Sequence, residues 1–303
     1  MVEHRVEFRL SENPWAPTAV IQDINEQTGA GLSLTGLSNQ VGGSSSAAFA
    51  RRPDGREVAL TRTKLSVERM RQTADVLNSL RDRDFPVPRQ EMVLPLSDGR
   101  VAVVQERLPG SQPDRVDIGM VDALVELNEQ FRDVLADMRW VPRPEAFPIT
   151  AAPLWEATLG QHSDRSRRVL DAIRAAEGGS LYQMTGDDLV HIDFSIENAL
   201  FDDSGKLTGI VDWNFGVARG DRRFSLLRLK SNVAGDYDAP AEVVDHLDRI
   251  LESSLGAELL RTYTIHRAVQ GVHHSIHNQL SPDRIDSDLR TAESRLGIGG
   301  ASR

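Results

Sequence analysis

The stretch LVHIDFSIENALFDDSGKLTGIVDWNFGVARGD, residues 189–221, decides the fold of this chain. Within it, two short apolar runs at 199–201 and 207–211 flank the polar turn 202–205. Apolar runs joined by such a glycine-containing turn predict a β-hairpin. A hairpin folds its two ends together, so polar residues at those ends are expected to meet although the hairpin separates them in the sequence.

Side chains with oxygen atoms stand at both ends of this hairpin. Asp193 and Asn198 precede it, and Asp212 follows it. Carboxylate and carboxamide oxygens are ligands that Mg²⁺ prefers. Phosphoryl transfer uses such a set, because one carboxylate takes the hydroxyl proton while two oxygen ligands hold metal on the nucleotide. We therefore expect Asn198 and Asp212 to bind Mg²⁺ and Asp193 to be catalytic; the competing interpretation is an ordinary hairpin with solvated carboxylates.

The motif also carries a family resemblance. His191, Asp193 and Asn198 stand in the spacing H-x-D-x4-N. With Asp212 behind the hairpin, they resemble the catalytic loop and metal-binding aspartate of the protein-kinase-like superfamily. Trp213 and the later GVARGD are similar to the aminoglycoside/macrolide phosphotransferase family, whereas protein kinases would show Phe-Gly after the aspartate.

The resemblance implies an α+β, two-lobed protein-kinase-like fold. Its N-lobe would be an antiparallel sheet with one helix, and its C-lobe would be mainly helical. It also implies an ATP- or GTP-dependent O-phosphotransferase that uses Mg²⁺ and moves the γ-phosphoryl group to a hydroxyl of a small molecule. The family-implied acceptor is an antibiotic of aminoglycoside or macrolide type, whose phosphorylation would give resistance. His191 is then expected to brace the loop and hold Asp193 in place.

Length and composition agree with an enzyme of this class. The chain has 303 residues with 40% apolar content, enough for a large core. It has no apolar run of roughly eighteen residues and begins with the charged MVEHRVEFRL, so we expect a soluble, cytoplasmic protein without a membrane partner. A net charge of −10 argues against nucleic acid as a partner, and the lack of cysteine excludes disulfides and thiolate chemistry.

Residues 1–107 are expected to form the nucleotide-binding lobe, and residues 108–303 the catalytic and substrate-binding lobe. Alternation over 2–10 predicts a strand, and a short helix is expected from Thr18, as its N-cap, to Glu26. Five further strands are expected near 32–37, 47–51, 57–62, 91–94 and 100–105, with a helix over 66–82 between the third and fourth. This order is that of a kinase-like small lobe and supports the motif independently.

Two segments of this lobe are expected to contact the nucleotide. The turn 40–46 is rich in glycine and serine, whose backbone N–H groups and hydroxyls can meet phosphate oxygens. The segment that leaves the fifth strand and reaches Pro-Gly resembles a kinase hinge, whose backbone would pair with the purine edge, although an interdomain linker would look the same. The residues concerned are Gly42, Gly43, Ser44 and Ser45 in the turn, and Gln105, Glu106, Arg107 and Leu108 in the hinge.

The third strand departs from the family pattern. VALT at 58–61 occupies the register in which the superfamily has V-A-I-K, so Thr61 replaces the phosphate-binding lysine. We expect Arg62, with Lys64 second, to supply the missing charge, which requires a bulge or a one-residue slip in the strand. Two solvated cations are the competing interpretation. Neither Glu68 nor Asp75 on the following helix is a compelling carboxylate partner.

The second lobe is expected to be mainly helical, with helices over 117–135, 163–176, 241–252, 257–280 and one that begins after Asp221. On the helix over 257–280, His266, Gln270, His273 and His277 recur at spacings that place them on one face. If this face is functional, the resemblance implies that it belongs to the acceptor pocket, because the last helices of the family wall the substrate cleft. A polar helix face, or a metal site at His273 and His277, are the alternatives.

Other functions remain open at this point. Thr61 and the missing carboxylate partner favour a catalytically inactive nucleotide- or ligand-binding pseudokinase as the second hypothesis. A metabolite kinase with a choline- or sugar-like acceptor and a histidine metalloprotein are further alternatives. The sequence does not decide the oligomeric state.

Overall fold

The computed structural model describes residues 16–38, 47–144, 153–176, 184–235, 237 and 239–298. Contacts divide the chain into two compact units, and each unit is built from two separate segments of the sequence. The first unit comprises Met1–Pro113 and Glu197–Gly216, and the second comprises Asp114–Ile196 and Val217–Arg303. The expected lobes, divided after residue 107, differ from these units chiefly in the hairpin, which packs with the first unit.

Backbone hydrogen bonds explain why the hairpin belongs to the first unit. Ile210 N–H donates to the carbonyl of Pro86 over 2.8 Å, and Ser111 and Phe201 exchange two bonds of 2.9 Å. The Thr208 hydroxyl donates to the carbonyl of Pro109 over 2.6 Å. The hairpin therefore continues the hydrogen-bonded structure of residues 86–111.

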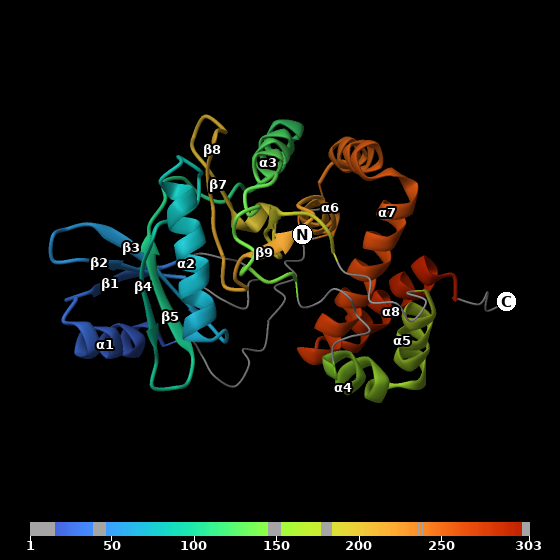
Figure 1. The fold of residues 1–303 in the computed structure, drawn as a ribbon, viewed down its shortest axis with the longest axis horizontal. Helices are drawn as coiled ribbons and strands as arrows, with labels where there is room; N and C mark the ends of the chain where they lie inside the picture. Colours follow the sequence, from blue (N-terminus) through green and yellow to red (C-terminus); the bar gives the residue numbers. More distant parts are fainter. Residues whose placement is uncertain are drawn as a thin grey trace, which may run out of the picture. The chain divides into compact units, whose positions relative to one another are not determined.

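A five-stranded antiparallel sheet forms the centre of the first unit (Figure 1). Helix α2 (Val67–Arg81) follows its third strand in the sequence. The strands are β1 (Ser33–Leu37), β2 (Ala48–Arg51), β3 (Glu57–Thr63), β4 (Gln90–Pro95) and β5 (Val101–Glu106), in the order β1-β2-β3-β5-β4. The five strands and the helix over 66–82 are confirmed, and with them the kinase-like small lobe.

The sheet carries a helix on each face, and alternate residues of β3 point to the two faces. On one face, Leu60 packs in a core with Ile24 of helix α1 (Pro17–Thr28). On the other face, Met70 of α2 packs with Val103 of β5. Thr61 lies opposite Val103 in the β3–β5 ladder, so it lies on the α2 face.

The starts of the two helices show different capping. The Ser66 side chain accepts a hydrogen bond from Arg69 N–H and caps α2, as its sequence predicts. The expected capping role of Thr18 is wrong, because α1 begins at Pro17 after Ala16. Proline suits the first helical position because its ring sets φ and it lacks the N–H that this position leaves unpaired. The strand expected over 2–10 lies outside the described residues.

The hairpin consists of β7 (Ala199–Phe201) and β8 (Leu207–Ile210), as expected. Gly205 has a φ of +81°, which a residue with a side chain rarely adopts. A short 3₁₀ turn, Ile196–Asn198, leads into β7. The hairpin is therefore closed by glycine at the turn and by a tight helical turn at its entrance.

The second unit is mainly helical. Its strands β6 (Asp188–Val190) and β9 (Ala218–Gly220) pair with each other. Its helices are α3 (Ile118–Gln130), α4 (Pro153–His162), α5 (Asp164–Ala176), α6 (Arg223–Gly235), α7 (Ala241–His277) and α8 (Pro282–Leu296). Helices α4, α5, α7 and α8 enclose one apolar core, as their grouping in Figure 1 shows. The expected helical lobe is confirmed.

Two helices differ from their expected bounds. Helix α7 contains a break at Gly256, with φ of 69° and ψ of 166°, and its two arms match the two helices expected on either side. Helix α3 ends at Gln130, five residues early, because the following backbone pairs elsewhere: Leu189 N–H donates to Phe131 O, and Leu135 N–H donates to Asp187 O. No helix in the described ranges combines the length and the apolar character that crossing a membrane requires.

Candidate active site

The base of the hairpin brings two of the predicted metal ligands together. Val211 N–H donates to the carbonyl of Asn198 over 2.8 Å, so Asn198 lies beside the backbone that carries Asp212. Asn198 is 3% exposed, and the indole N–H of Trp213 donates to Ile210 O over 3.1 Å, which fixes the chain around Asp212. The backbones of Asn198 and Asp212 are thus neighbours, and their side chains carry oxygen atoms of the kind that a magnesium site uses.

Asp212 has an unusual backbone conformation. Its φ is +59°, in the left-handed region that non-glycine residues rarely occupy. Such a conformation costs energy and persists where the surroundings enforce it, often at functional sites. The strain supports the assignment of Asp212 as a positioned ligand and not as a solvated carboxylate.

The segment after Asp212 docks against β3 and α2 within the first unit. The Thr63 hydroxyl donates to Asn214 O over 2.7 Å. A Cβ on Gly216 would lie 3.1 Å from the Thr73 hydroxyl and 3.4 Å from Nε of Arg69, both on α2. Helix α2 thus presents an arginine toward this segment, at the side of the sheet where the superfamily carries its lysine-glutamate pair.

Arg62 lies on the other side of the sheet. Strand β3 keeps its register against β2 and β5 without a shift, so the bulge that would turn Arg62 toward Thr61 is absent. Arg62 pairs with Ala102, on the α1 face, and its side chain is 10% exposed and lies 3.2 Å from Asp98. Burial and the nearby charge of Arg100 lower the pKa of Arg62, although Asp98 opposes this.

The expected hinge follows β5. Three of its side chains contact neighbouring residues of the first unit. Gln105 accepts a hydrogen bond from Gln90 over 2.8 Å, and Glu106 binds Arg81 in a bidentate pair. Arg107 binds Glu57, and its guanidinium lies over Phe49 at 4.0 Å from the ring centre. Burial favours a raised pKa for Glu106, but the bonds from Arg81 and from Arg89 N–H outweigh it and lower the pKa.

Leu108 differs from these three residues in the hydrogen bonding of its backbone. Its N–H and C=O make no hydrogen bond to any residue that the structure describes. Its side chain is buried against Gly209, where an added Cβ would lie 2.5 Å from Leu108 Cδ1. This arrangement suits recognition of a purine edge by backbone groups. The predicted phosphate contacts Gly42, Gly43, Ser44 and Ser45 lie outside the described residues.

In the second unit, the loop after β6 carries Asp193. Its N–H donates to Nδ1 of His191 over 3.1 Å, which places the proton of a neutral His191 ring on Nε2. The buried His191 ring meets Phe194 edge-on, with 6.0 Å between centres. A residue that holds Asp193 in position, as expected of His191, would make this hydrogen bond.

Asp193 has a cationic neighbour that the sequence did not indicate. Nε of Arg228, on α6, donates to Oδ1 of Asp193 over 2.8 Å. Burial alone would raise the pKa of Asp193, but the charge and hydrogen bond of Arg228, with the charges of His191 and Arg267, lower it. Asp193 therefore stays ionised. No local motif could reveal Arg228 or Arg267, because they come from helices far along the chain.

The expected acceptor face of α7 is mixed in character. His266 is buried, with Nδ1 2.8 Å from Thr262 O. His273 lies 2.8 Å from the Thr158 hydroxyl and meets the Trp155 ring at 4.6 Å, and burial lowers its pKa to about 4. His277 stacks on His273 at 5.4 Å and is exposed. Within the described ranges no three His, Asp or Glu side chains gather as a metal site.

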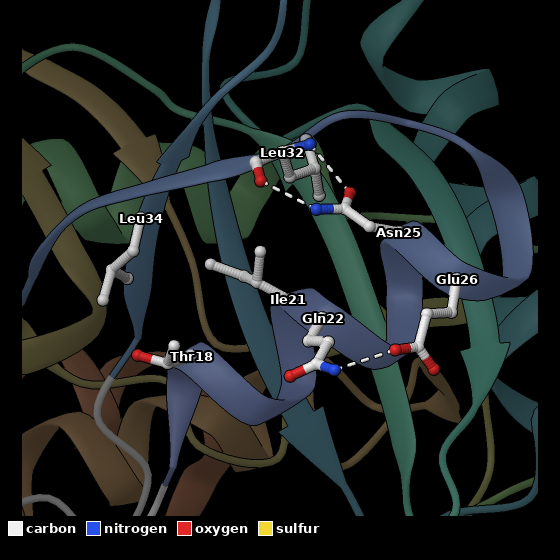
Figure 2. Close-up of a pocket in the computed structure, with 7 residues that line it drawn as sticks. All are labelled: Thr18, Ile21, Gln22, Asn25, Glu26, Leu32 and Leu34. Carbon is white, nitrogen blue, oxygen red and sulfur yellow. Dashed lines mark hydrogen bonds between the residues drawn. The ribbon is translucent and has the colours of Figure 1, made fainter.

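Two open hollows lie on the first unit. The one on the α1 face has a volume of about 470 Å³, and its polar groups already bond to one another: Asn25 exchanges two bonds with Leu32, and Gln22 donates to Glu26 (Figure 2). The other, about 740 Å³, includes Glu106, Arg107 and Leu108. Only the second touches residues of the expected nucleotide site.

Comparison with known proteins identifies the family. The model of a family described as "Phosphotransferase enzyme family" matches residues 39–219, more than half of the chain. The chain belongs to this family. It is therefore an enzyme of the small-molecule kinase class, with an alcohol group as acceptor. No curated protein sequence matches it.

Solved structures support the same fold for this phosphotransferase. Aminoglycoside phosphotransferase APH(4)-Ia, in ternary complex with AMP-PNP and hygromycin B, is 16% identical, with a TM-score of 0.64 over 94% of this chain and all of that one. Amicoumacin kinase hAmiN, with AMP-PNP, Ca²⁺ and Ami, is 14% identical, with a TM-score of 0.68 over 93% of this chain and 95% of that one. Choline kinase LicA from Streptococcus pneumoniae is 12% identical, with a TM-score of 0.63 over 93% and 98%. At these identities the likeness establishes the fold alone.

Asp221 and Ser225 of this phosphotransferase differ in how their buried side chains are bonded. Asp221 is buried and accepts hydrogen bonds from Arg223 and from the hydroxyl of Tyr263 over 2.8 Å, so it ties the start of α6 to α7. The Ser225 hydroxyl is buried without a hydrogen-bond partner among the described residues.

Proposed function

We propose that this phosphotransferase moves the γ-phosphoryl group of ATP to a hydroxyl of a small molecule, with Mg²⁺. The observation that carries the proposal is the base of the hairpin, where a hydrogen bond places Asn198 beside Asp212 and Asp212 takes a strained conformation. Two oxygen ligands held in this way suit a metal bound to nucleotide phosphates. The AMP-PNP in two of the similar structures supports ATP over GTP.

The chain's own residues would divide the work between the two units. In the first unit, the backbone of Leu108 would pair with the purine, and Asn198 and Asp212 would hold Mg²⁺, which neutralises charge on the phosphates. In the second unit, Asp193 would orient the acceptor hydroxyl and take its proton as the oxygen bonds to the γ-phosphorus and the bond to the β–γ bridging oxygen breaks. His191 would keep Asp193 in place. Most of the acceleration would come from alignment and charge neutralisation.

The acceptor is a small hydroxylated molecule. Relatives of this fold include kinases named for an aminoglycoside, for amicoumacin and for choline, so the fold accommodates acceptors of different size and charge. An antibiotic of aminoglycoside or macrolide type is the acceptor that the resemblance implied.

The test separates nucleotide binding from transfer. We expect MgAMP-PNP to raise the melting temperature of the wild type, Asp212→Asn to abolish this rise, and Asp193→Asn to keep it. With ATP and a panel of hydroxylated compounds, Asp193→Asn should lower transfer by roughly 10²–10⁴-fold. Asp203→Asn, in the exposed turn of the hairpin, is the matched control. A melting temperature that MgAMP-PNP does not raise in the wild type, and that Asp212→Asn does not change, would contradict the proposal.

A second candidate function is an inactive nucleotide-binding protein. Thr61 favours it, because threonine cannot supply the charge that lysine provides to the phosphates. This candidate predicts stabilisation by MgAMP-PNP without transfer to any compound. Phosphoryl transfer that depends on Asp193 would exclude it.

A further inference from the structure

Phe49 of β2 lies on the same face of the sheet as α2. Its neighbours in the strand, Ala48 and Ala50, belong to the core on the α1 face, so the ring of Phe49 points to the opposite face. In the ladders, Phe49 lies opposite Ala59 of β3, which in turn lies opposite β5. Ala59 thus separates Phe49 from β5, the strand that leads to Leu108.

The guanidinium of Arg107 covers the ring of Phe49. Its carbon Cζ lies 4.0 Å from the ring centre, where a cation and an aromatic ring attract each other. Nη1 of Arg107 donates to Oε2 of Glu57 over 2.6 Å, which holds the guanidinium at the ring. The side chains of Arg107 and Glu57 are 39% and 38% exposed, so water can replace this ion pair at little cost. The cover over Phe49 can therefore open.

The covered ring belongs to the same part of the first unit as the expected purine contact. Arg107 directly precedes Leu108, whose backbone N–H and C=O make no hydrogen bond to any residue that the structure describes. Glu57, Arg107 and Leu108 also line the hollow of about 740 Å³. A base whose edge pairs with the Leu108 backbone still has a flat face to bury, and Phe49 offers it an aromatic surface. Stacking on such a ring suits any base, because every base has a π-face.

We propose that the purine of the nucleotide stacks on Phe49, and that Arg107 occupies this place in the nucleotide-free enzyme and must leave it before the base can enter. This inference rests on the proposed function, because it takes Leu108 as the purine contact. The apparent Kd is then raised by the fraction of molecules in which the ring is uncovered. An exposed cation–π contact and an exposed ion pair together raise it about three- to tenfold.

Adenosine tests the base contact without the phosphates, whose negative charge Arg107 would also attract. By calorimetry we expect Arg107→Ala to bind adenosine about three- to tenfold more tightly than the wild type. Glu57→Gln should tighten binding less, because Arg107 keeps the ring but loses its ion pair. Arg56→Gln is the matched control, since Arg56 lines the same hollow but pairs with Asp54 and Glu91. Unchanged or weaker binding of adenosine by Arg107→Ala would overturn the proposal.

A double-mutant cycle shows whether Arg107 acts through the ring of Phe49. We expect Phe49→Leu, which keeps an apolar side chain but removes the ring, to weaken adenosine binding about tenfold. In the Phe49→Leu background, Arg107→Ala should no longer tighten binding, because the guanidinium has no ring to cover. If Arg107→Ala tightened binding equally in both backgrounds, Phe49 would not be the place that Arg107 blocks.

The salt dependence of adenosine binding tests the same contact with Phe49 left in place. Adenosine is uncharged, whereas salt screens the exposed ion pair between Arg107 and Glu57. We therefore expect the affinity of the wild type for adenosine to rise as NaCl increases from about 0.1 M to about 1 M, and that of Glu57→Gln to stay constant. A wild-type affinity that does not rise would count against the ion pair as the holder of Arg107.

Binding of MgAMP-PNP keeps this inference apart from the proposed function. If MgAMP-PNP raises the melting temperature of the wild type while Arg107→Ala fails to tighten adenosine binding, only the role of Arg107 and Phe49 is wrong. A wild type that MgAMP-PNP does not stabilise would instead count against the proposed function itself.

Discussion

At the scale of the residue, the pairing of Asp193 with Arg228 decides what kind of base the carboxylate can be. A carboxylate held at 2.8 Å from a guanidinium stays ionised and binds protons weakly. Its contribution to catalysis is then mainly to orient the acceptor hydroxyl, with the proton passing over as the phosphoryl group leaves. This agrees with a reaction in which alignment and charge neutralisation supply most of the acceleration.

Replacement of Arg228 by glutamine should raise the pKa of Asp193, because the carboxylate loses its strongest favourable charge while its burial remains. In the wild type, the stability that the pair contributes is present above the usual pKa of 3.8 and is lost as pH falls through the lowered value. We therefore expect the Arg228→Gln variant to lose less stability on acidification. The pKa is measured by carbon-13 NMR of the carboxyl carbon, assigned with Asp193→Asn. Arg261→Gln, which changes an exposed arginine on α7, is the control, and an unchanged pKa in Arg228→Gln would contradict the assignment.

At the scale of the element, β3 carries no cation at Thr61, whereas α2 carries Arg69 on the same face of the sheet. The superfamily places its lysine on the third strand, whereas here the strand carries Thr61 on the α2 face and Arg62 on the α1 face. Helix α2 presents Arg69 next to Gly216, close to the segment that follows Asp212. A cation is thus present on the α2 face of the sheet, where Thr61 also lies, but it comes from the helix.

Nucleotide affinity distinguishes the two arginines. We expect Arg69→Gln to weaken MgAMP-PNP binding by roughly tenfold, about the worth of one charge-assisted hydrogen bond. Arg62→Gln should change affinity little, because its side chain pairs with Asp98 on the far face. Arg71→Gln, exposed on α2, is the control. Calorimetry measures all three, and a loss confined to Arg62→Gln would restore the original expectation for that residue.

The elements that the sequence predicts are those whose patterns are local. Short apolar runs indicate β1 to β5, the apolar spacing over 66–82 indicates α2, and the glycine turn marks the β7–β8 hairpin. Strands β6 and β9 have three residues each and exist only because they pair with one another across the chain, so no local pattern announces them. Arg228 and Arg267 also lie far from Asp193 in the sequence, so no local pattern indicates that they are near it. The motif supplies Asp193, whereas tertiary packing supplies the cations around it.

At the scale of the whole molecule, the chain returns to its first unit after leaving it. Residues 197–216 follow a long segment of the second unit, yet they pack with 1–113. The proposed nucleotide contacts at Leu108, Asn198 and Asp212 therefore all belong to one unit, while Asp193 and its arginines belong to the other. Nucleotide and acceptor should act on different parts of the chain.

Hydrogen exchange tests this division directly. A ligand that binds only the folded state, present at a concentration a hundred times its dissociation constant, raises the free energy of opening by about 2.7 kcal/mol. This protection from exchange applies to segments whose opening breaks the ligand contacts. We expect MgAMP-PNP to slow exchange in β3, in β5 and in the hairpin at 197–216, and to leave α5 and α8 unchanged. Asp212→Asn should remove the protection from all three segments together, whereas Asp203→Asn should keep it. Contacts that the nucleotide makes with the first unit slow the opening of only those segments that unfold together with the contacted residues. If protection appeared in α5 and α8, or did not appear in the hairpin, the nucleotide would not be bound by the discontinuous first unit.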